Sequence, residues 1–425
     1  MNKMIERVFR RKRSLGISGI VLFLLYLGMI IVFSVNSEAA EKQTLRIGCV
    51  APITGLFSGL GEPIGKGALL AAKLINEENR GILGRKVEIL IRDDEMRPAT
   101  GIRMARELNK QHGINLFTGV ISSAVALALK PVMEEMNSLL LTAGAESTKI
   151  TGKDWSPNIF RVSYDARTCS YAAAELLHKK YPQIKKWATI GGDYEYGHNC
   201  IEHFLNRLKQ LDPTVEVVIQ RWPKLGAGGG YGSHINAIMT TDADGMFSSL
   251  FGGDLISFIR EANPFGLFNK LKVFGNGQMD WDNPYALGKD MVEIWAREMY
   301  YAPAYNNPLS KKFEKNMIQT YGENYFKLYQ GHAGGGFDAV YAYKAAIEKA
   351  KSFDIEKIRK ALEDLTFDSP NGKKWIRAGD HQAYFDILYY HIVPDSKEEA
   401  GWKVDSWTLI DGKKNAIPVE EARKQ

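Results

Sequence analysis

A glycine-rich segment near the start of the chain has the residue types of a phosphate-binding loop but not their spacing. Residues 45–50 form an apolar run with one charge, which is typical of a buried strand. Gly59 and Gly61 follow, but Ile64 stands where the third glycine of a dinucleotide-binding G-x-G-x-x-G motif belongs. A P-loop is excluded as well, because glycine rather than serine or threonine follows the Gly-Lys pair. The spacing favours a loop, followed by a helix over 68–76, that lines a cleft for another small molecule.

The motifs of common hydrolases and redox enzymes are absent from the sequence. It contains no G-x-S-x-G, H-E-x-x-H or C-x-x-C. Asp93 and Asp94 could act as paired carboxylates in acid–base work, but no partner group stands near them in the sequence. We therefore expect a protein that is not an enzyme and that needs no cofactor.

Three cysteines could carry redox or metal chemistry. Cys49 lies in the first predicted strand and is interpreted as a small core residue. Cys169 and Cys200 each lie near the start of a predicted helix and could form a disulfide in an oxidising compartment, with free thiols as the alternative. His198 and His203 flank Cys200, but these offsets do not share one helix face, so no metal site is predicted.

The N-terminal segment has the pattern of an export signal. Residues 1–13 are strongly basic, residues 14–37 are uncharged and apolar, and Ala39 and Ala40 suit cleavage. The apolar run is also long enough to span a bilayer, so an uncleaved anchor is the alternative. The body is expected to be exported, either to the periplasm or to the outer face of the cytoplasmic membrane. Without residues 1–40, which hold six basic and two acidic side chains, the formal net charge falls from +6 to +2, and no basic field for nucleic acid remains.

The remaining chain alternates strands and helices, which predicts parallel sheets wrapped by helices in two successive units. The strands are expected at 45–50, 87–92, 116–120, 139–143, 159–162, 187–191, 215–220, 246–251 and 271–274. The helices between them are expected at 68–76, 98–112, 124–137, 166–179, 197–211 and 254–262, with Pro131 interrupting the third and a loop at 226–232. The less regular C-terminal part is expected to contain a strand at 292–299, helices at 309–321, 337–351 and 355–364, and antiparallel strands at 374–377 and 384–393.

Several short motifs occur in this chain in the order found in one known family. They are Pro52-Ile53-Thr54-Gly55, the Gly61 segment, Asp93-Asp94 before Pro98, Gly119-Val120-Ile121-Ser122-Ser123, the strand end at 142–145 and Asp193-Tyr194-Glu195-Tyr196-Gly197. Together they resemble the extracytoplasmic solute-binding proteins of branched-chain amino acid ABC importers, which have the periplasmic-binding type I fold. The resemblance extends from about residue 45 to about residue 393.

This resemblance implies an α/β fold of two Rossmann-like lobes with parallel sheets, joined by a multi-strand hinge. It also implies a small-molecule ligand and a membrane permease as partners, and no nucleic acid. The expected division is a signal or anchor at 1–40, lobe 1 at 43–165 and 330–372, lobe 2 at 166–329 and 373–412, and a tail at 413–425.

The expected site on the first lobe lies at two strand ends. Ser122 and Ser123 stand where a strand leads into a helix, whose unpaired N–H groups and dipole suit a carboxylate. Helix capping is the alternative role for Ser123. Gly144 and Ala145 would let backbone groups approach the ligand, as the family implies. Glu146 departs from the threonine usual in the family, and it could either hold a ligand ammonium group or exclude ordinary amino acids.

The second lobe is expected to add aromatic and acidic residues. The family match carries Tyr196 over as a pocket wall and Phe251 as an aromatic contact, with core packing as the alternative for Tyr196. The acidic residue of amino acid binders is not in register, so Gln278 and Asp280 are proposed from the segment near its place. Leu60 stands where the family often has a bulky aromatic residue.

The resemblance implies a solute-binding component of an ABC importer that closes its lobes on a small carboxylate, such as an amino acid. A membrane-tethered ligand sensor and a binder of aromatic acids or amides are the alternatives. The sequence identifies neither the solute nor the oligomeric state.

Overall fold

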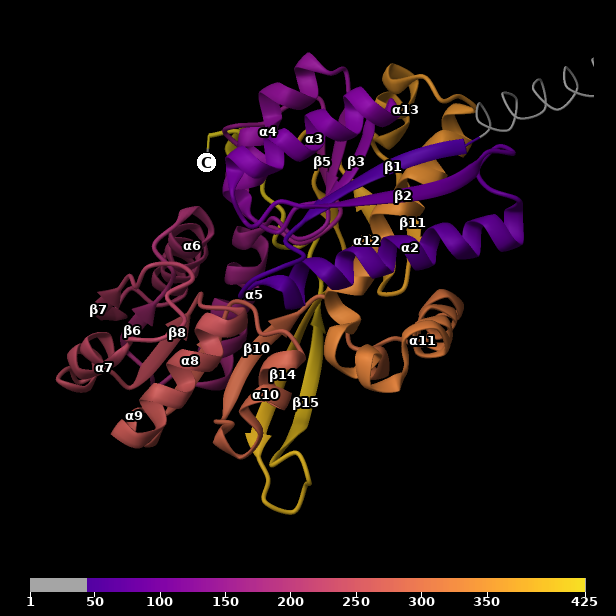
Figure 1. Ribbon diagram of the computed structural model, residues 1–425. Helices are drawn as coiled ribbons and strands as arrows, with labels where there is room; N and C mark the ends of the chain where they lie inside the picture. Colours follow the sequence, from indigo (N-terminus) through magenta and orange to yellow (C-terminus); the bar gives the residue numbers. More distant parts are fainter. Residues whose placement is uncertain (1–43, 425) are drawn as a thin grey trace, which may run out of the picture.

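The computed structural model describes residues 44–424, so the predicted signal or anchor segment lies outside the described residues. Two lobes, each built on its own β-sheet, lie one above the other in Figure 1. This arrangement confirms the predicted two-lobed α/β fold. Within residues 44–424, no helix combines the length and the apolar character needed to cross a bilayer.

The first lobe has a fully parallel five-stranded sheet in the order β2-β1-β3-β4-β5. The inner strands of this sheet are mostly apolar because helices cover both faces of the sheet. The strands are β1 (Thr44–Ala51), β2 (Lys86–Asp93), β3 (Leu116–Gly119), β4 (Leu139–Thr142) and β5 (Ile159–Arg161). The helices that follow them in this part of the chain are α2 (Ser58–Asn79), α3 (Pro98–His112), α4 (Ser123–Glu135) and the short η1 (Thr148–Ile150).

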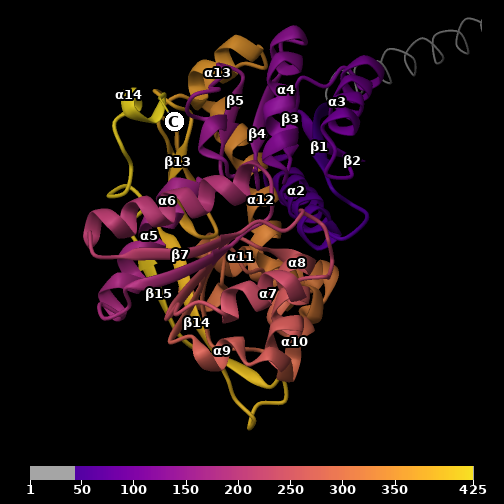
Figure 2. The same ribbon diagram turned by 90° about the vertical axis from the view of Figure 1, so that its left-hand side faces the viewer.

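The second lobe has a seven-stranded sheet in the order β15-β14-β10-β9-β8-β6-β7, in which β14 and β15 run antiparallel to their neighbours. Figure 2 shows α5 and α6 on one face of this sheet and α7 to α10 on the other. The strands are β6 (Lys186–Ile190), β7 (Glu216–Arg221), β8 (Gly245–Ser248), β9 (Val273–Asn276), β10 (Ile294–Glu298), β14 (Ile387–Pro394) and β15 (Trp402–Ile410). The helices are α5 (Ala166–Lys180), α6 (Glu195–Leu211), α7 (Gly232–Met239), α8 (Gly252–Ala262), α9 (Leu267–Lys270) and α10 (Asp282–Leu287).

The chain passes from the first sheet to the second after β5, leaves the second sheet after β10, and rejoins it at β14. Between β10 and β14 lie α11 (Pro308–Tyr321), α12 (Glu323–Ala350), α13 (Ile355–Leu362), β11 (Thr366–Ser369), β12 (Gly372–Ile376) and β13 (Ala383–Tyr384). The last helix is α14 (Val419–Ala422). The lobe boundaries expected from the sequence stay a prediction, because strand order does not fix the residue at which a lobe ends.

The glycine-rich segment is part of helix α2, not the loop that the sequence predicted. Helices α2 and α12 pack backbone to backbone, and glycine permits this approach. A Cβ at Gly67 would lie 1.8 Å from the carbonyl oxygen of Ala333, and one at Gly336 would lie 1.9 Å from that of Ile64. The glycines therefore serve helix packing, with a partner more than 260 residues away in the sequence.

Other local predictions need correction. Helix α4 continues through Pro131 without a break. Strand β15 was not predicted, because its alternating exposed and partly buried residues include two charged residues, Lys403 and Asp405. The expected strand over 384–393 is divided between β13 and β14, which belong to different sheets.

All three cysteines are free thiols, so Cys169 and Cys200 follow the free-thiol alternative and not the disulfide. The sulfur of Cys200 lies 3.4 Å from the hydroxyl oxygen of Ser170, which donates to it. Burial raises the pKa of Cys200 to about 11 and also raises that of Cys169. This disfavours the thiolate form that disulfide exchange requires.

Candidate functional site

A buried ion pair joins the two lobes. Glu146 follows strand β4 of the first lobe, and Arg297 lies on strand β10 of the second. The distance from Arg297 Nη2 to Glu146 Oε2 is 2.6 Å, and the two side chains are 0% and 2% exposed. Burial raises the pKa of Glu146, and the charge of Arg297 opposes that rise. Because the pair is closed to solvent, the structure corresponds to a closed arrangement of the lobes.

Each member of this pair has a polar atom without a hydrogen-bond partner among the described residues. These atoms are Glu146 Oε1 and Arg297 Nη1. The rest of the guanidinium is occupied, because Nε donates to the carbonyl of Gly277 at 2.9 Å and Nη2 also reaches Gln278 Oε1 at 3.2 Å. Buried polar groups normally have partners, so a bound solute or an ordered water is needed to satisfy these two atoms.

The two predicted serines lie at the N-terminus of α4. Ser122, not Ser123, is the N-cap residue, and its Oγ accepts from the backbone N–H of Val125 at 3.4 Å. The Oγ of Ser123 accepts from the backbone N–H of Ser147 at 3.1 Å. Both residues are buried. Since both oxygens act as acceptors in these bonds, each hydroxyl hydrogen is available to donate to a solute.

Arg161 hydrogen-bonds the backbone of the turn that contains Gly144 and Ala145. This fully buried guanidinium donates to the carbonyls of Ala145 at 3.4 Å and Ser147 at 2.7 Å. A Cβ at Gly144 would lie 2.5 Å from Ile121 Cδ1, so a larger residue there would require the Ile121 side chain to move. The expected close approach of the ligand to this backbone stays a prediction.

Aromatic rings from both lobes pack against one another at the lobe interface. Phe57 at the start of α2 lies 5.4 Å from Phe251 at the start of α8, measured between ring centroids. Tyr196 lies 5.9 Å and Tyr194 6.1 Å from the same Phe251 ring. Tyr196 and Phe251 were predicted, whereas Phe57 and Tyr194 were not. The family often has a bulky aromatic residue at the position of Leu60. In this chain Phe57, three residues earlier, supplies an aromatic ring instead.

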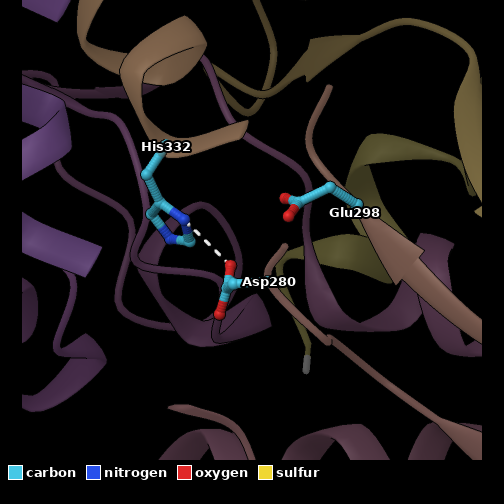
Figure 3. Close-up of side chains that lie close together, drawn as sticks. All are labelled: Asp280, Glu298 and His332. Carbon is cyan, nitrogen blue, oxygen red and sulfur yellow. Dashed lines mark ion pairs between the residues drawn. The ribbon is translucent and has the colours of Figure 1, made fainter. Parts of the chain in front are cut away.

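The loop after β9 places Gln278 and Asp280 next to His332 of helix α12. The Gln278 side chain donates to Asp280 Oδ1 at 3.2 Å, and His332 Nδ1 lies 2.9 Å from the same oxygen. Figure 3 shows that Glu298, at the end of β10, completes a cluster with Asp280 and His332. Burial and the charge of Asp280 raise the pKa of Glu298.

A second set of contacts across the lobes lies at the start of α6. Ser147 Oγ donates to Glu195 Oε1 at 2.9 Å, and Lys149 Nζ bonds Glu195 Oε2 at 2.8 Å. The backbone N–H of Thr148 donates to Asn199 at 2.9 Å. Beside these contacts lies a cavity of about 700 Å³ that contains none of the predicted ligand-binding residues.

The comparisons with known proteins agree with this geometry. The sequence model described as "Periplasmic binding protein" matches residues 44–397. The chain belongs to the periplasmic binding protein family. This confirms the family resemblance predicted from the sequence, and the family acts outside the cytoplasm.

Individual members differ in their reported ligands. The chain is 23% identical over 346 residues to Leu/Ile/Val-binding protein homolog 6 from Brucella melitensis, covering 80% of this chain and 85% of that protein. It shares a TM-score of 0.77 and 21% identity with a solute-binding protein of an R. palustris ABC transporter in complex with 4-hydroxybenzoate, covering 90% and 100% of the two chains. A leucine-binding protein from Thermotoga maritima gives a TM-score of 0.73 at 20% identity, covering 87% and 100%.

Sequence reasoning missed the charged residues of the second lobe that reach the interface. Arg297 and Glu298 occur in the run Ile294–Glu298, which is buried along its whole length. Two charges in a buried strand require partners, and this was the available signal. His332 gave no such signal, because its acidic partners come from distant segments.

Proposed function

We propose that this protein is the solute-binding component of an ABC importer and that it closes its lobes on a small solute bearing a carboxylate. The observation that carries the proposal is the pair of unpartnered buried atoms, Glu146 Oε1 and Arg297 Nη1, on opposite lobes. An unsatisfied buried polar group costs about 1–3 kcal/mol, so a solute that pairs with both atoms stabilises the closed form.

The donors around this position suit a carboxylate. Arg297 Nη1 is a charged donor, and Ser122 and Ser123 can each donate a hydroxyl hydrogen from the start of α4. Glu146 Oε1 is an acceptor, which suits an ammonium, amide or hydroxyl group elsewhere on the same solute.

The ring cluster of Phe57, Tyr194, Tyr196 and Phe251 supports an aromatic or branched aliphatic body for the solute. One structural neighbour was solved in complex with 4-hydroxybenzoate, and another is named a leucine-binding protein. Both 4-hydroxybenzoate and leucine meet this description. We therefore place aromatic acids and leucine-like amino acids first, with amides as the alternative.

The proposed mechanism has three steps and no chemical reaction on this chain. The open protein binds the solute at Ser122, Ser123 and the 145–146 turn. Closure then brings Tyr196, Phe251 and the 278–282 segment onto it and excludes water. The closed form presents both lobes to a membrane permease, whose ATPase supplies the energy for transport.

A ligand screen tests this proposal. A specific solute raises the melting temperature, so we would measure thermal shifts with leucine, 4-hydroxybenzoate, benzamide and succinate. For the best compound, the double variant Ser123→Ala with Glu146→Ala should bind at least about tenfold more weakly by calorimetry, since two polar contacts are lost. The matched control removes another serine–glutamate pair of the first lobe, Ser156 and Glu134, whose hydrogen bond is 2.7 Å long. Equal affinity in both double variants would refute the proposed pocket.

The tethered-sensor alternative requires an uncleaved N-terminus. The intact mass of the exported protein distinguishes the two, because cleavage would leave a chain that starts near Ala40 or Glu41.

A further inference from the structure

Asp280, Glu298 and His332 form a cluster that the solute-binding proposal does not use in full. The three side chains come from three separate segments and point toward one another in Figure 3. One ligand atom from each lies within 4.8 Å of the other two, and the residues are 3%, 1% and 3% exposed. Small movements of these side chains would place all three atoms around one ion, because metal–ligand bonds are about 2.0–2.2 Å long.

Carboxyl groups outnumber basic groups at this position. Asp282 lies close enough to Asp280 for their carboxyl groups to interact, and Glu298 interacts with both. The ring of His332 contacts Asp280, whereas the guanidinium of Arg297 is directed to Glu146 and Gln278. Asp280 Oδ2 has no hydrogen-bond partner among residues 44–424. Buried carboxylates without matching charge are costly, and a bound cation removes that cost.

The surrounding helices leave room for these carboxylates. A Cβ at Gly331 of α12 would lie 2.2 Å from Glu298 Oε1, and a Cβ at Gly59 of α2 would lie 2.8 Å from Asp282 Oδ2. Glycine at both positions therefore lets acidic groups of the second lobe approach helices that pack in the first. Glu298 is also held in place, because its Oε2 accepts from the backbone N–H of Trp281 at 3.2 Å.

We propose that Asp280, Glu298 and His332 bind a divalent first-row transition-metal ion at the lobe interface. Imidazole together with carboxylate oxygens is a ligand set that suits Zn²⁺ and its neighbours, whereas Ca²⁺ takes oxygen ligands only. Because His332 lies on α12 and the carboxylates belong to the second lobe, the ion links the lobes and favours their closed arrangement.

The test uses the whole exported protein, stripped with a chelator and free of solute. Calorimetry with ZnCl₂ should show one site, and CaCl₂ should give no binding. The volume-conserving variants Glu298→Gln and His332→Gln should each weaken Zn²⁺ binding at least about tenfold, since each removes one ligand. Circular dichroism checks whether each variant is folded. If one variant does not fold, the other is sufficient for the test.

His391 provides a matched control. It also lies between two acids, but Glu293 contacts its Nε2 at 3.1 Å and Asp405 its Nδ1 at 3.2 Å. The carboxylates face opposite ring nitrogens and cannot share one ion with the ring, so His391→Ala should leave Zn²⁺ binding unchanged. Absence of Zn²⁺ binding, or equal affinity in His332→Gln and the wild type, would overturn the proposal. Since no solute is present, either result leaves the solute-binding proposal to its own test.

Discussion

The ion pair between Glu146 and Arg297 gives the most specific prediction about the closed lobes. Because both side chains are almost completely buried, removal of one partner leaves an uncompensated charge inside the protein. We expect Glu146→Gln and Arg297→Met each to lower the free energy of unfolding by about 3–5 kcal/mol. The double variant removes both charges and should lose less than the sum of the single losses, with a coupling energy of about 2 kcal/mol or more.

Urea unfolding at pH 7, followed by tryptophan fluorescence, measures these differences, provided that the slopes of the transitions stay equal. The matched control is an exposed pair of the same types, Arg46 and Glu88, which lie 2.9 Å apart with side chains 32% and 51% exposed. Their variants Arg46→Met and Glu88→Gln should change the free energy by about 1 kcal/mol or less. If the single variants at 146 and 297 behaved like this control, the pair would be in contact with water and the lobes would not close around it.

Three further predictions concern packing, pH and the second interlobe contact. Gly67→Ala should lower the free energy of unfolding by about 1–3 kcal/mol or more, measured by thermal unfolding, because its Cβ would collide with the backbone of α12. Gly232→Ala should leave the free energy of unfolding unchanged, because no atom lies near the position of its Cβ. Burial and a neighbouring carboxylate raise the pKa of Asp282 to about 7, so the folded protein holds this proton more tightly than the unfolded chain. The free energy of unfolding should therefore fall as pH rises from about 4 to about 7, and Asp282→Asn should reduce that fall by roughly 1–3 kcal/mol; an unchanged pH profile would contradict this. Glu195→Gln should weaken the contacts of α6 with η1 and so increase the radius of gyration in small-angle scattering. An unchanged radius would show that these contacts do not hold the lobes together.

The sequence was sufficient to predict the strands of the first lobe and the overall class. Buried parallel strands such as β3 and β4 are short apolar runs with clear boundaries, so local pattern identifies them. The start of helix α2 was predicted too late in the sequence, because its glycines are required by the close packing against Ala333 of α12. The local sequence pattern contains no information about that contact. The N-cap is Ser122 rather than Ser123, a displacement of one residue that lies within the usual uncertainty of a helix terminus.

The candidate site was only partly predictable for a related reason. Glu146, Tyr196 and Phe251 follow motifs that occur close to strand ends, and the structure brings all three to the lobe interface. Arg297 and His332 come from a central strand and from the middle of a long helix, and their partners lie about 150 and 50 residues away in the sequence. Such contacts follow from the way the two lobes fold against each other, not from local sequence.

The most direct test of the central claim is a crystal structure grown with the compound that raises the melting temperature most. We predict that the compound lies between the lobes, with its carboxylate in hydrogen-bond contact with Arg297 Nη1 and with Ser122 or Ser123. A compound bound instead in the outer cavity, beside Lys149 and Lys424, would contradict the account.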